Sequence, residues 1–549
     1  MTLAPERPQG PAAPPYRGPG RPRRARAGVM EIVPLPVWAV VLGGLGASAL
    51  VAAIVVELGP LFGAAAAIGV AGLVWVAQRP VLLALLAVIL VPVTSGLKRG
   101  LPVPGLKVSE VLVVLAALVV LGFGARRFPG PRWRAWDWAA LAYCSGTAVM
   151  AFVNVAVHQT PIVGEDINTM LGPLQFLLLY RVVAAVFATE ALRAVALRGL
   201  LLASLPVSIL ALLQMLGPPV FQTIAVSLSG TGIFITPGYD PVMRATSVFP
   251  MWHPLGGYLA IVIIIAVALL IQRDTTVLPR WLNVGVLALA TGGLMLTLTA
   301  TIIGGALLGV LVVGWALKRL RFMVKWLVIG GTIAVIAFFP QIRERIDEQN
   351  VDTRATPNAS ESILPQTVQY RILVWTEQYA PALSGSWVTG YGPADPPGIS
   401  WDHTESGYIT LILRGGLPYL LVGGLVVWFA WRAGRERLEG GLGALSPPEA
   451  AIAASVLATA FMTPIINLFF PYWTASGMPQ PMWALWGLLA AALGSTGGGA
   501  LPRRDVASSG PQRRPGGPAA DAPAAAEPAS GAAPAAPGRT ADPRVARPV

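Results

Sequence analysis

The sequence predicts an all-α polytopic membrane protein with about 12 to 14 transmembrane helices and one large extracytoplasmic loop. Hydrophobic residues make up 55% of the 549 residues and charged residues only 12%, whereas soluble domains carry about 25% charged residues. Apolar stretches of near-membrane length follow one another along most of the chain. Basic residues gather in alternate connections between these stretches, which is typical of a membrane topology.

The two ends of the chain are predicted to be disordered cytoplasmic tails. Residues 1–34 are rich in Pro, Gly and Arg, and residues 495–549 are rich in Ala, Pro and Gly. Neither region has the spaced large apolar residues that offset the entropy of ordering a chain. The basic first tail runs into a long apolar stretch without an early small-residue cleavage site, so we expect no cleavable signal peptide.

Fourteen apolar stretches between the tails are predicted to be helices, eleven within residues 35–339 and three within 407–494. Each is near the roughly 20 residues needed to cross about 30 Å of hydrocarbon, and two of them are short. The polar segment 340–406 separates the two groups. The predicted helices are 36–56, 60–77, 80–95, 108–124, 137–157, 169–188, 199–216, 254–271, 282–299, 302–317, 325–339, 407–431, 448–469 and 479–494.

The basic residues predict the orientation of these helices. If the first tail is cytoplasmic, the connections on the same side contain most of the loop arginines, such as Arg126, Arg198 and Arg435. The short connections on the other side contain almost none apart from Lys98, Arg99 and Lys107. By the positive-inside rule, both termini are cytoplasmic, and residues 217–253 and 340–406 are extracytoplasmic.

Composition also excludes several classes of protein and site. The single cysteine, Cys144, rules out an intramolecular disulfide framework and is predicted to be a small buried hydrophobic residue. The net charge of +13 is explained by the membrane topology rather than by binding to nucleic acid. Three histidines without a cysteine cluster predict no zinc site. The sequence contains no phosphate-binding Walker loop and no dinucleotide fingerprint.

The most informative part of the polar segment is its end, which reads Trp401-Asp402-His403-Thr404-Glu405 and leads into an apolar helix. Glu405 or His403 is placed to remove a proton from a sugar hydroxyl as a general base. A competing interpretation is that Thr404 or Asp402 caps the helix and that Glu405 completes the cap. Capping alone does not account for the histidine and the flanking tryptophan.

Arginines near the extracytoplasmic face are candidates for binding a diphosphate. Arg244 precedes the helix at 254–271, Arg371 lies in a segment of amphipathic helical spacing, and Arg414 lies about two turns into the helix at 407–431. Guanidinium groups bind phosphate in a bidentate manner, although interfacial arginines also extend to lipid headgroups. Because Arg414 is on the helix that follows Glu405, we expect it to face the same cavity. Arg181, inside an apolar stretch, is expected to be structural or to contact headgroups.

Four segments in order along residues 80–490 carry a resemblance to a known family. They are Arg244–Leu259, the hydroxyl-rich Leu296–Leu307, Arg371 with Trp375 and Gly390-Tyr391-Gly392, and the block from Glu405-Ser406 to Gly416-Leu417-Pro418. Together they resemble the O-antigen ligase and polymerase family of bacterial envelope glycan enzymes. Two positions depart from its pattern: Ala300-Thr301 stands where the ligases have Ser-Arg, and Glu405 stands at the position of the loop histidine, with His403 two residues earlier.

The resemblance implies a multi-helix, lipid-donor glycosyltransferase in the bacterial inner membrane. Such an enzyme takes a glycan from an undecaprenyl-diphosphate carrier and passes it to an acceptor hydroxyl of a glycan or lipid on the outer face, without a metal or other cofactor. Surrounding membrane lipids are the remaining partners. The residues implied are Glu405 and His403 as catalytic base, Arg244, Arg371 and Arg414 at the diphosphate, and Trp387, Tyr391 and Trp401 at the sugars.

The main alternative is a transporter or flippase of lipid-linked sugars, and a non-catalytic membrane scaffold is a further one. Carriers often show two related halves and acids within their helices. This sequence has no obvious internal repeat, and Glu57 and Glu110 lie at the ends of apolar stretches. These features favour an enzyme, and they leave open whether it is a ligase or a polymerase.

Overall fold

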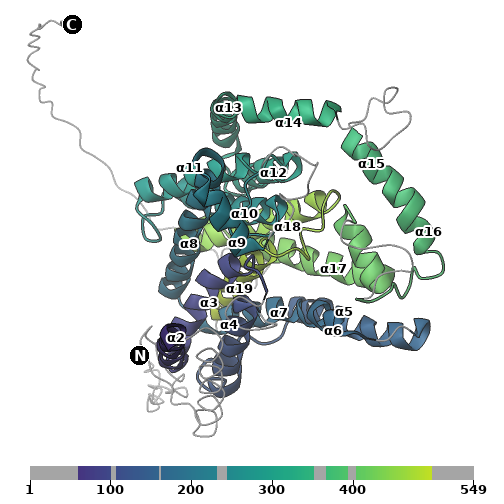
Figure 1. The fold of residues 1–549 in the computed structure, drawn as a ribbon. Coiled ribbons are helices and arrows are strands. Elements are labelled where there is room, and N and C mark those ends of the chain that lie inside the picture. Colours follow the sequence, from purple (N-terminus) through teal and green to yellow (C-terminus); the bar gives the residue numbers. More distant parts are fainter. Residues whose placement is uncertain are drawn as a thin grey trace, which may run out of the picture. The chain divides into compact units, whose positions relative to one another are not determined.

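The computed structural model describes residues 60–99, 107–159, 162–230, 244–351, 366–393 and 404–496 (Figure 1). Within these ranges the regular structure is helical and contains no strand, as the sequence predicts. The first predicted helix, 36–56, lies outside the described residues. So do the predicted tails 1–34 and 495–549, except for residues 495 and 496.

The remaining thirteen predicted stretches each coincide with helical structure. The first half of the chain forms α2 (Pro60–Ala77), α3 (Pro80–Thr94), α4 (Val108–Ala117) with the π-helical η1 (Leu118–Phe123), α5 (Ala135–His158), α6 (Gly164–Leu171), α7 (Leu174–Val186), α8 (Glu190–Leu216), α9 (Val220–Ser229) and α10 (Trp252–Gln272). The second half forms α11 (Arg280–Met295), α12 (Ala300–Ala316), α13 (Leu320–Ala337), α14 (Phe339–Val351), α15 (Gln366–Val374), η4 (Trp375–Tyr379), α16 (Ala380–Ala382), α17 (Gly407–Glu439), η6 (Leu442–Ala444), α18 (Pro447–Ile466) and α19 (Pro479–Thr496).

Seven helices among the described residues are long and apolar enough to cross a membrane, or eight if the bent pair α2 and α3 is one span. This architecture is that of a multi-pass membrane protein. The sequence predicts more full spans, because it also includes 36–56, which lies outside the described residues, and the helices at 108–124, 282–299, 302–317 and 479–494, which are not among these seven. Two predicted loops contain helices: α9 lies within 217–253, α15 and α16 lie within 340–406, and α14 lies there except for its first residue, Phe339.

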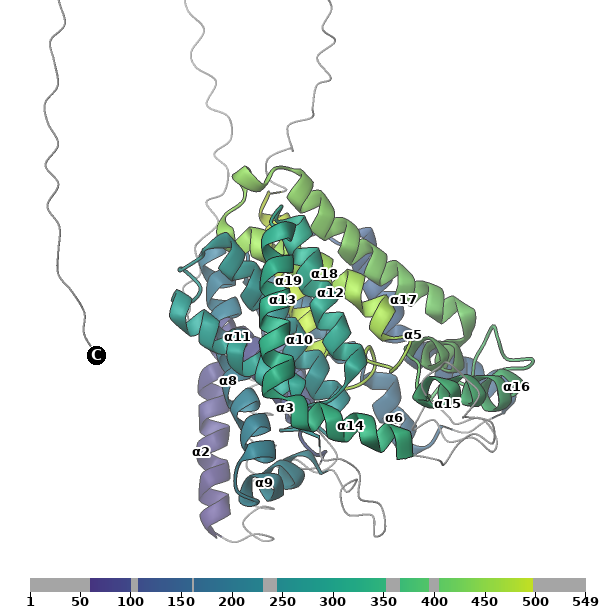
Figure 2. The same ribbon diagram turned by 90° about the horizontal axis from the view of Figure 1, so that it is seen from above.

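The core of the bundle is built around α10. Its apolar side chains surround the whole helix, and the residues from Pro254 to Leu269 are buried. A helix that is apolar on all sides has to be enclosed by others, and α10 packs against α11, α12 and α18 (Figure 2). A second buried region lies between α7 and α19, where the ring centroids of Tyr180 and Trp483 are 6.0 Å apart and those of Trp483 and Trp486 are 5.2 Å apart.

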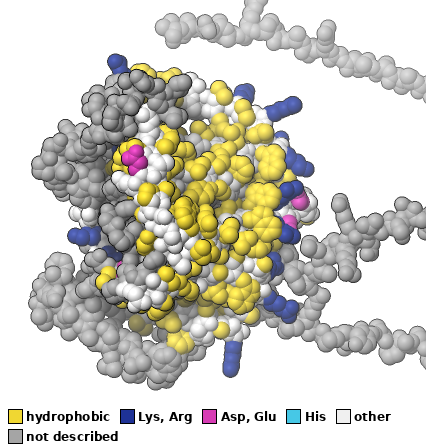
Figure 3. All heavy atoms as spheres, turned by 90° about the vertical axis from the view of Figure 1, so that its right-hand side faces the viewer, with side chains coloured by type: hydrophobic (Ala, Val, Ile, Leu, Met, Phe, Trp, Pro, Cys, Tyr) yellow, Lys and Arg dark blue, Asp and Glu magenta, His cyan; other side chains and the backbone are white. Residues whose placement is uncertain are grey.

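Apolar side chains also cover much of the outer surface. Figure 3 shows one face with a broad apolar area that has Lys and Arg side chains at its edges. On α17, Leu421, Leu425 and Trp428 are 68%, 48% and 44% exposed. Soluble proteins rarely expose such continuous apolar areas, whereas a lipid-facing surface requires them.

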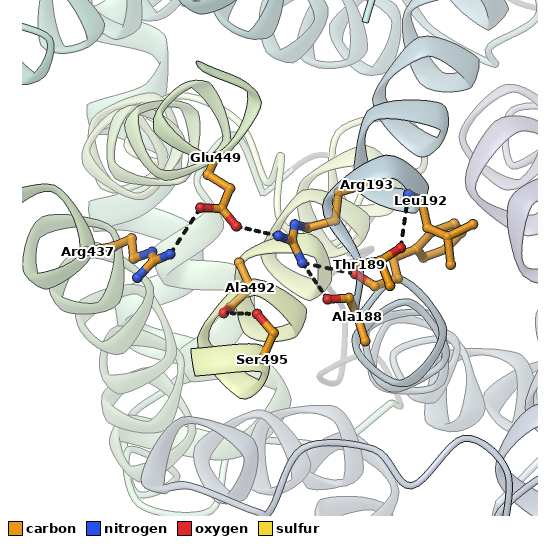
Figure 4. A network of polar contacts seen from close by, with 9 residues as sticks. Ala188, Thr189, Leu192, Arg193, Arg437, Glu449, Ala492 and Ser495 are labelled. Atoms are coloured by element: carbon orange, nitrogen blue, oxygen red, sulfur yellow. Dashed lines mark hydrogen bonds and ion pairs between the residues drawn. The ribbon is translucent and has the colours of Figure 1, made fainter. Parts of the chain in front are cut away.

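Buried ion pairs join the ends of several helices. Glu449, in the first turn of α18, binds Arg193 of α8 and, at 3.1 Å, Arg437 of α17 (Figure 4). Arg193 also donates to the carbonyl of Ala188 at 2.8 Å. Arg193 and Arg437 lie in connections that the positive-inside rule predicts to be cytoplasmic, and Glu449 lies at the start of the predicted helix that follows one of them. The structure therefore brings together connections that the predicted topology puts on the same side of the membrane. Which side of the membrane that is stays a prediction.

Arg181, the arginine inside an apolar stretch, has a structural role. Its Nη1 donates to Asp137 Oδ1 at 2.6 Å, and its Nη2 donates to the carbonyl of Pro131 at 3.1 Å. The other carboxylate oxygen of Asp137 accepts from the backbone N–H of Arg134 at the start of α5. The charge of Arg181 is therefore neutralised at the beginning of α5, as the structural interpretation predicts.

Candidate functional site

The turn that leads into α17 is held by the end of α18. Glu405 has a left-handed backbone with φ of 53°, and Ser406 occupies the N-cap position without a side-chain cap. The N–H of Gly407 donates to the carbonyl of Asn467 at 2.7 Å, and a Cβ at position 407 would come within 2.3 Å of Asn467 Oδ1. Only glycine permits this approach, so α18 determines where the Glu405 turn lies.

The capping interpretation is wrong for Thr404 and Glu405, because neither side chain caps the N-terminus of α17. Thr404 Oγ1 lies 2.6 Å from Thr410 Oγ1 and does not cap the helix. Glu405 points to another segment, where Nε of Arg371 donates to Oε2 at 2.9 Å and Nη2 of the same arginine forms an ion pair with that oxygen, also at 2.9 Å. The side chains of Arg371 and Glu405 are 18% and 25% exposed. Oε1 of Glu405 makes no hydrogen bond with the described residues.

The helical segment of Arg371 has a second attachment to this turn. Trp375 follows α15 directly, and its Nε1 donates to the carbonyl of Thr404 at 3.2 Å. The predicted helical spacing around Arg371 is confirmed, since Arg371 lies in the last turn of α15. Two polar motifs that are separated in the sequence therefore meet at one place.

Arg371 lines a cavity of about 630 Å³ together with Arg244. Thr299 and Thr301, at the start of α12, form another part of its wall, and His253 lies at the start of α10. The guanidinium carbon of Arg244 lies 4.4 Å from the centroid of the Trp252 ring. Two of the three predicted diphosphate arginines thus share one cavity at the N-terminal ends of α10 and α12, and anions are favoured at helix N-termini.

An aromatic group from the segment between α18 and α19 adjoins this cavity. The ring of Phe470 stacks on His253 with centroids 4.0 Å apart, and Tyr472 lies edge-on to His253 at 6.2 Å. The Tyr472 hydroxyl is buried and has no hydrogen-bond partner among the described residues. Burial raises the pKa of Tyr472 well above its usual value, while the nearby charges of Arg371 and Glu405 act in opposite directions. Tyr472 therefore stays protonated and is available as a donor.

Sequence reasoning does not find Tyr472, because a single tyrosine beside an apolar stretch has the ordinary signature of an interfacial anchor. The only signal in the sequence is the polar and aromatic composition of residues 467–478 between two apolar helices. The tertiary structure adds the information that this segment lies beside His253.

Arg414 does not join the other two arginines. It lines a separate cavity of about 210 Å³, with Arg99 and Lys107. It is absent from the described wall of the cavity that Arg371 and Arg244 share, and its role at a diphosphate stays a prediction. The regular spacing of a helix predicts which residues share a face with Arg414 only inside α17, which begins at Gly407. Glu405 precedes the helix and has a left-handed backbone, so this spacing does not extend to it.

Trp387 and Tyr391, two of the three predicted sugar-binding residues, lie on a loop that packs against a break in α17. The Tyr391 N–H donates to the carbonyl of Leu413 at 2.5 Å, and the Leu417 N–H donates to the carbonyl of Trp387 at 2.8 Å. The Tyr391 hydroxyl is already used, since it donates to the carbonyl of Ala382 at 2.6 Å. Trp387 is 41% exposed. Neither aromatic residue lines the Arg371 cavity, so their contact with a sugar stays a prediction.

Two predicted site residues, Trp401 and His403, lie outside the described residues. Within the described ranges, no group of three or more His, Cys, Asp or Glu side chains is arranged to hold a metal ion. A comparison with protein-family models and with curated proteins found no match to this chain. The candidate site is therefore defined by its own geometry, in which Arg371 links Glu405 to the cavity of Arg244.

Proposed function

We propose that this protein is an integral membrane glycosyltransferase that transfers or polymerises glycans from an undecaprenyl-diphosphate carrier onto an acceptor hydroxyl on the extracytoplasmic face, as in O-antigen ligases and polymerases. One observation carries the proposal: a carboxylate and a guanidinium, Glu405 and Arg371, are paired at a cavity that holds a second arginine, Arg244. A general base beside two cations matches the requirements of glycosyl transfer from a diphosphate.

The chemistry follows from these positions. Glu405 uses Oε1, the oxygen that does not accept from Arg371, to take the proton of the acceptor hydroxyl, and the acceptor oxygen forms a bond to the anomeric carbon of the donor sugar. The bond from that carbon to the diphosphate oxygen breaks, and its electron pair leaves with the diphosphate. Arg371 and Arg244 stabilise the charge that develops there, because guanidinium groups bind phosphate oxygens in a bidentate manner. His403, two residues before Glu405, is the second candidate for the base.

An apolar groove of about 930 Å³ between α17 and α18 supports a lipid-linked donor. It begins at Gly407, two residues from Glu405, and continues along the helices past Leu421 to Trp431. The walls contain almost only apolar side chains, and such a surface favours a polyprenyl chain over a soluble substrate. A carrier with its chain in this groove has its diphosphate near the start of α17.

The test is to measure lipid-linked glycans in cells that lack the protein and are complemented with the wild type or with Glu405→Gln. A polymerase predicts accumulation of single lipid-linked repeat units on the outer face and loss of long glycan. A ligase predicts accumulation of long lipid-linked chains that do not reach their acceptor. Intermediates that accumulate on the cytoplasmic face indicate a flippase instead, and an unchanged glycan profile excludes the proposal.

A further inference from the structure

The cavity that contains Arg414 is polar and lies apart from the Glu405 turn. Its volume is about 210 Å³, and its wall comes from the ends of α3 and α4, from α6, α7 and α17, and from the segment between α18 and α19. At about 30 Å³ for each water molecule, it has room for about seven waters. That space suits a phosphate-sized group.

Positive charge exceeds negative charge in the described wall of this cavity. Arg99, Lys107 and Arg414 face a single carboxylate, that of Glu110. Glu110 is already occupied, because both of its oxygens accept from Arg99, at 2.6 and 3.1 Å. Among the described residues of the wall, the cations therefore outnumber the carboxylates by two.

Lys107 shows the effect of this excess charge. Its Nζ donates to uncharged oxygens, the carbonyl of Ser95 at 3.1 Å and Ser476 Oγ at 3.2 Å. Burial lowers the pKa of Lys107, the positive charge of Arg99 lowers it further, and Glu110 acts in the opposite direction. An anion in the cavity would relieve the repulsion between these cations.

Two buried donors in the same wall have no hydrogen-bond partner among the described residues. Ser109 Oγ belongs to a fully buried residue, and Trp473 Nε1 belongs to one that is 5% exposed. A buried polar group without a partner is costly, and nearly all such groups in proteins are paired with protein, water or a ligand. A bound oxyanion supplies acceptors for both.

We propose that this cavity is a second anion site that binds a phosphate group. The three cations provide the attraction, and the Ser109 hydroxyl and the Trp473 N–H provide neutral donors. The phosphate can come from a soluble compound or from the headgroup of a lipid, since both present the same oxygen atoms. This inference is independent of the proposed transferase activity, because neither Arg371 nor Glu405 lines the cavity.

The test uses the full-length protein in a phosphate-free sugar detergent, with radiolabelled inorganic phosphate in equilibrium dialysis at constant ionic strength. The wild type is expected to bind phosphate, and Arg414→Gln to bind it about tenfold more weakly or worse, because a hydrogen bond to a charged group is lost. Arg432→Gln is the matched control. It makes the same change on the same helix at a side chain that is 54% exposed, and phosphate binding should not change.

If Arg414→Gln does not fold, Lys107→Gln and Ser109→Ala replace it. Ser109→Ala removes a buried hydroxyl that has no partner among the described residues, so it should leave stability intact and weaken phosphate binding several-fold. A parallel binding measurement with phosphatidic acid in mixed micelles shows whether the bound phosphate group comes from a soluble compound or from a lipid headgroup. Binding of that lipid without binding of inorganic phosphate supports a headgroup site. Absence of both, or binding abolished by Arg244→Gln and retained by Arg414→Gln, overturns the inference.

Discussion

Arg371 holds Glu405 by one oxygen only: its Nε and Nη2 both lie 2.9 Å from Oε2. A guanidinium that binds a carboxylate side by side would use both oxygens. The arrangement seen here fixes the position of Glu405 and leaves Oε1 without a hydrogen bond among the described residues. A positioned carboxylate with one oxygen open to accept a hydrogen bond is suited to act as a base.

Replacing the carboxylate tests this role directly. Glu405→Gln should lower glycan transfer about 100-fold or more, because it removes the proton acceptor and keeps the shape of the side chain. The measurement is the rate of transfer from purified lipid-linked donor, with thermal unfolding as a check of folding. Glu436→Gln, at a side chain that is 58% exposed, is the control and should transfer at the wild-type rate. A Glu405→Gln protein of normal activity would shift the assignment to His403.

Arg371 should be sensitive to the shape of its side chain as well as to its charge. Arg371→Lys keeps a positive charge but loses the planar fork, so we expect transfer to fall about tenfold. Arg371→Ala removes the charge as well and leaves Glu405 without its partner, so a loss of about 100-fold is expected. The comparison of transfer rates between the two variants separates geometry from charge. Equal activity of Arg371→Lys and the wild type would show that the fork geometry is not required.

The buried Tyr472 hydroxyl should have opposite effects on activity and stability. Tyr472→Phe removes a donor beside Arg371 and Glu405 but also a polar group that lacks a partner among the described residues. We expect slower transfer together with equal or higher thermal stability at neutral pH. A lower thermal stability of Tyr472→Phe than of the wild type at neutral pH would contradict this prediction, because it would show that folding needs the hydroxyl.

The raised pKa of Tyr472 also predicts a pH dependence of stability. The folded protein keeps this proton more tightly than the unfolded chain, whose tyrosines ionise near pH 10. The contribution of Tyr472 is therefore constant below about pH 10 and is lost progressively above it. Thermal unfolding between pH 8 and 11 should show a smaller alkaline loss for Tyr472→Phe than for the wild type. Parallel curves for the two proteins would contradict this account.

The break in α17 depends on a glycine. Gly416 has φ of 67° and ψ of −172°, a conformation open almost only to glycine, and a Cβ there would lie 2.0 Å from the carbonyl oxygen of Val388. Gly416→Ala should lower the free energy of unfolding by at least about 2 kcal/mol and release the loop of Trp387, which limited proteolysis detects. Gly424→Ala, in the same helix with open space around it, should be neutral or stabilising by up to about 1 kcal/mol. Similar stability of the two variants would refute a conformational role for Gly416.

The ion cluster of Glu449 is expected to be a major source of stability. Glu449→Gln leaves the buried guanidinium groups of Arg193 and Arg437 without their carboxylate, at an expected cost of about 3 kcal/mol. Thermal unfolding in detergent measures this cost. The exposed pair of Arg432 and Glu436 provides the comparison, since removing that carboxylate should cost less than about 0.5 kcal/mol. If both variants unfold alike, the cluster is not important for folding.

The sequence by itself determined the helical membrane architecture. The period and length of an apolar stretch such as 254–271 are local properties, and burial in lipid or in a helical bundle requires backbone hydrogen bonds within each segment. For the same reason the helix that contains Arg371 is predictable, and so is the structural role of Arg181, because charge within an apolar stretch needs a partner. The candidate roles of Arg244, Arg371 and Glu405 also come from the sequence, from the polar residues that border apolar helices.

Only the tertiary structure decided which of these residues meet. Arg371 and Glu405 are 34 positions apart, and the contact between them depends on α15, on the Asn467 turn and on the left-handed backbone of Glu405. Arg414, nine positions from Glu405 in the sequence, lines a different cavity for the same reason. Sequence periodicity extends only as far as a continuous helix, whereas long-range contacts depend on how separate helices pack, and that packing is a property of the whole bundle.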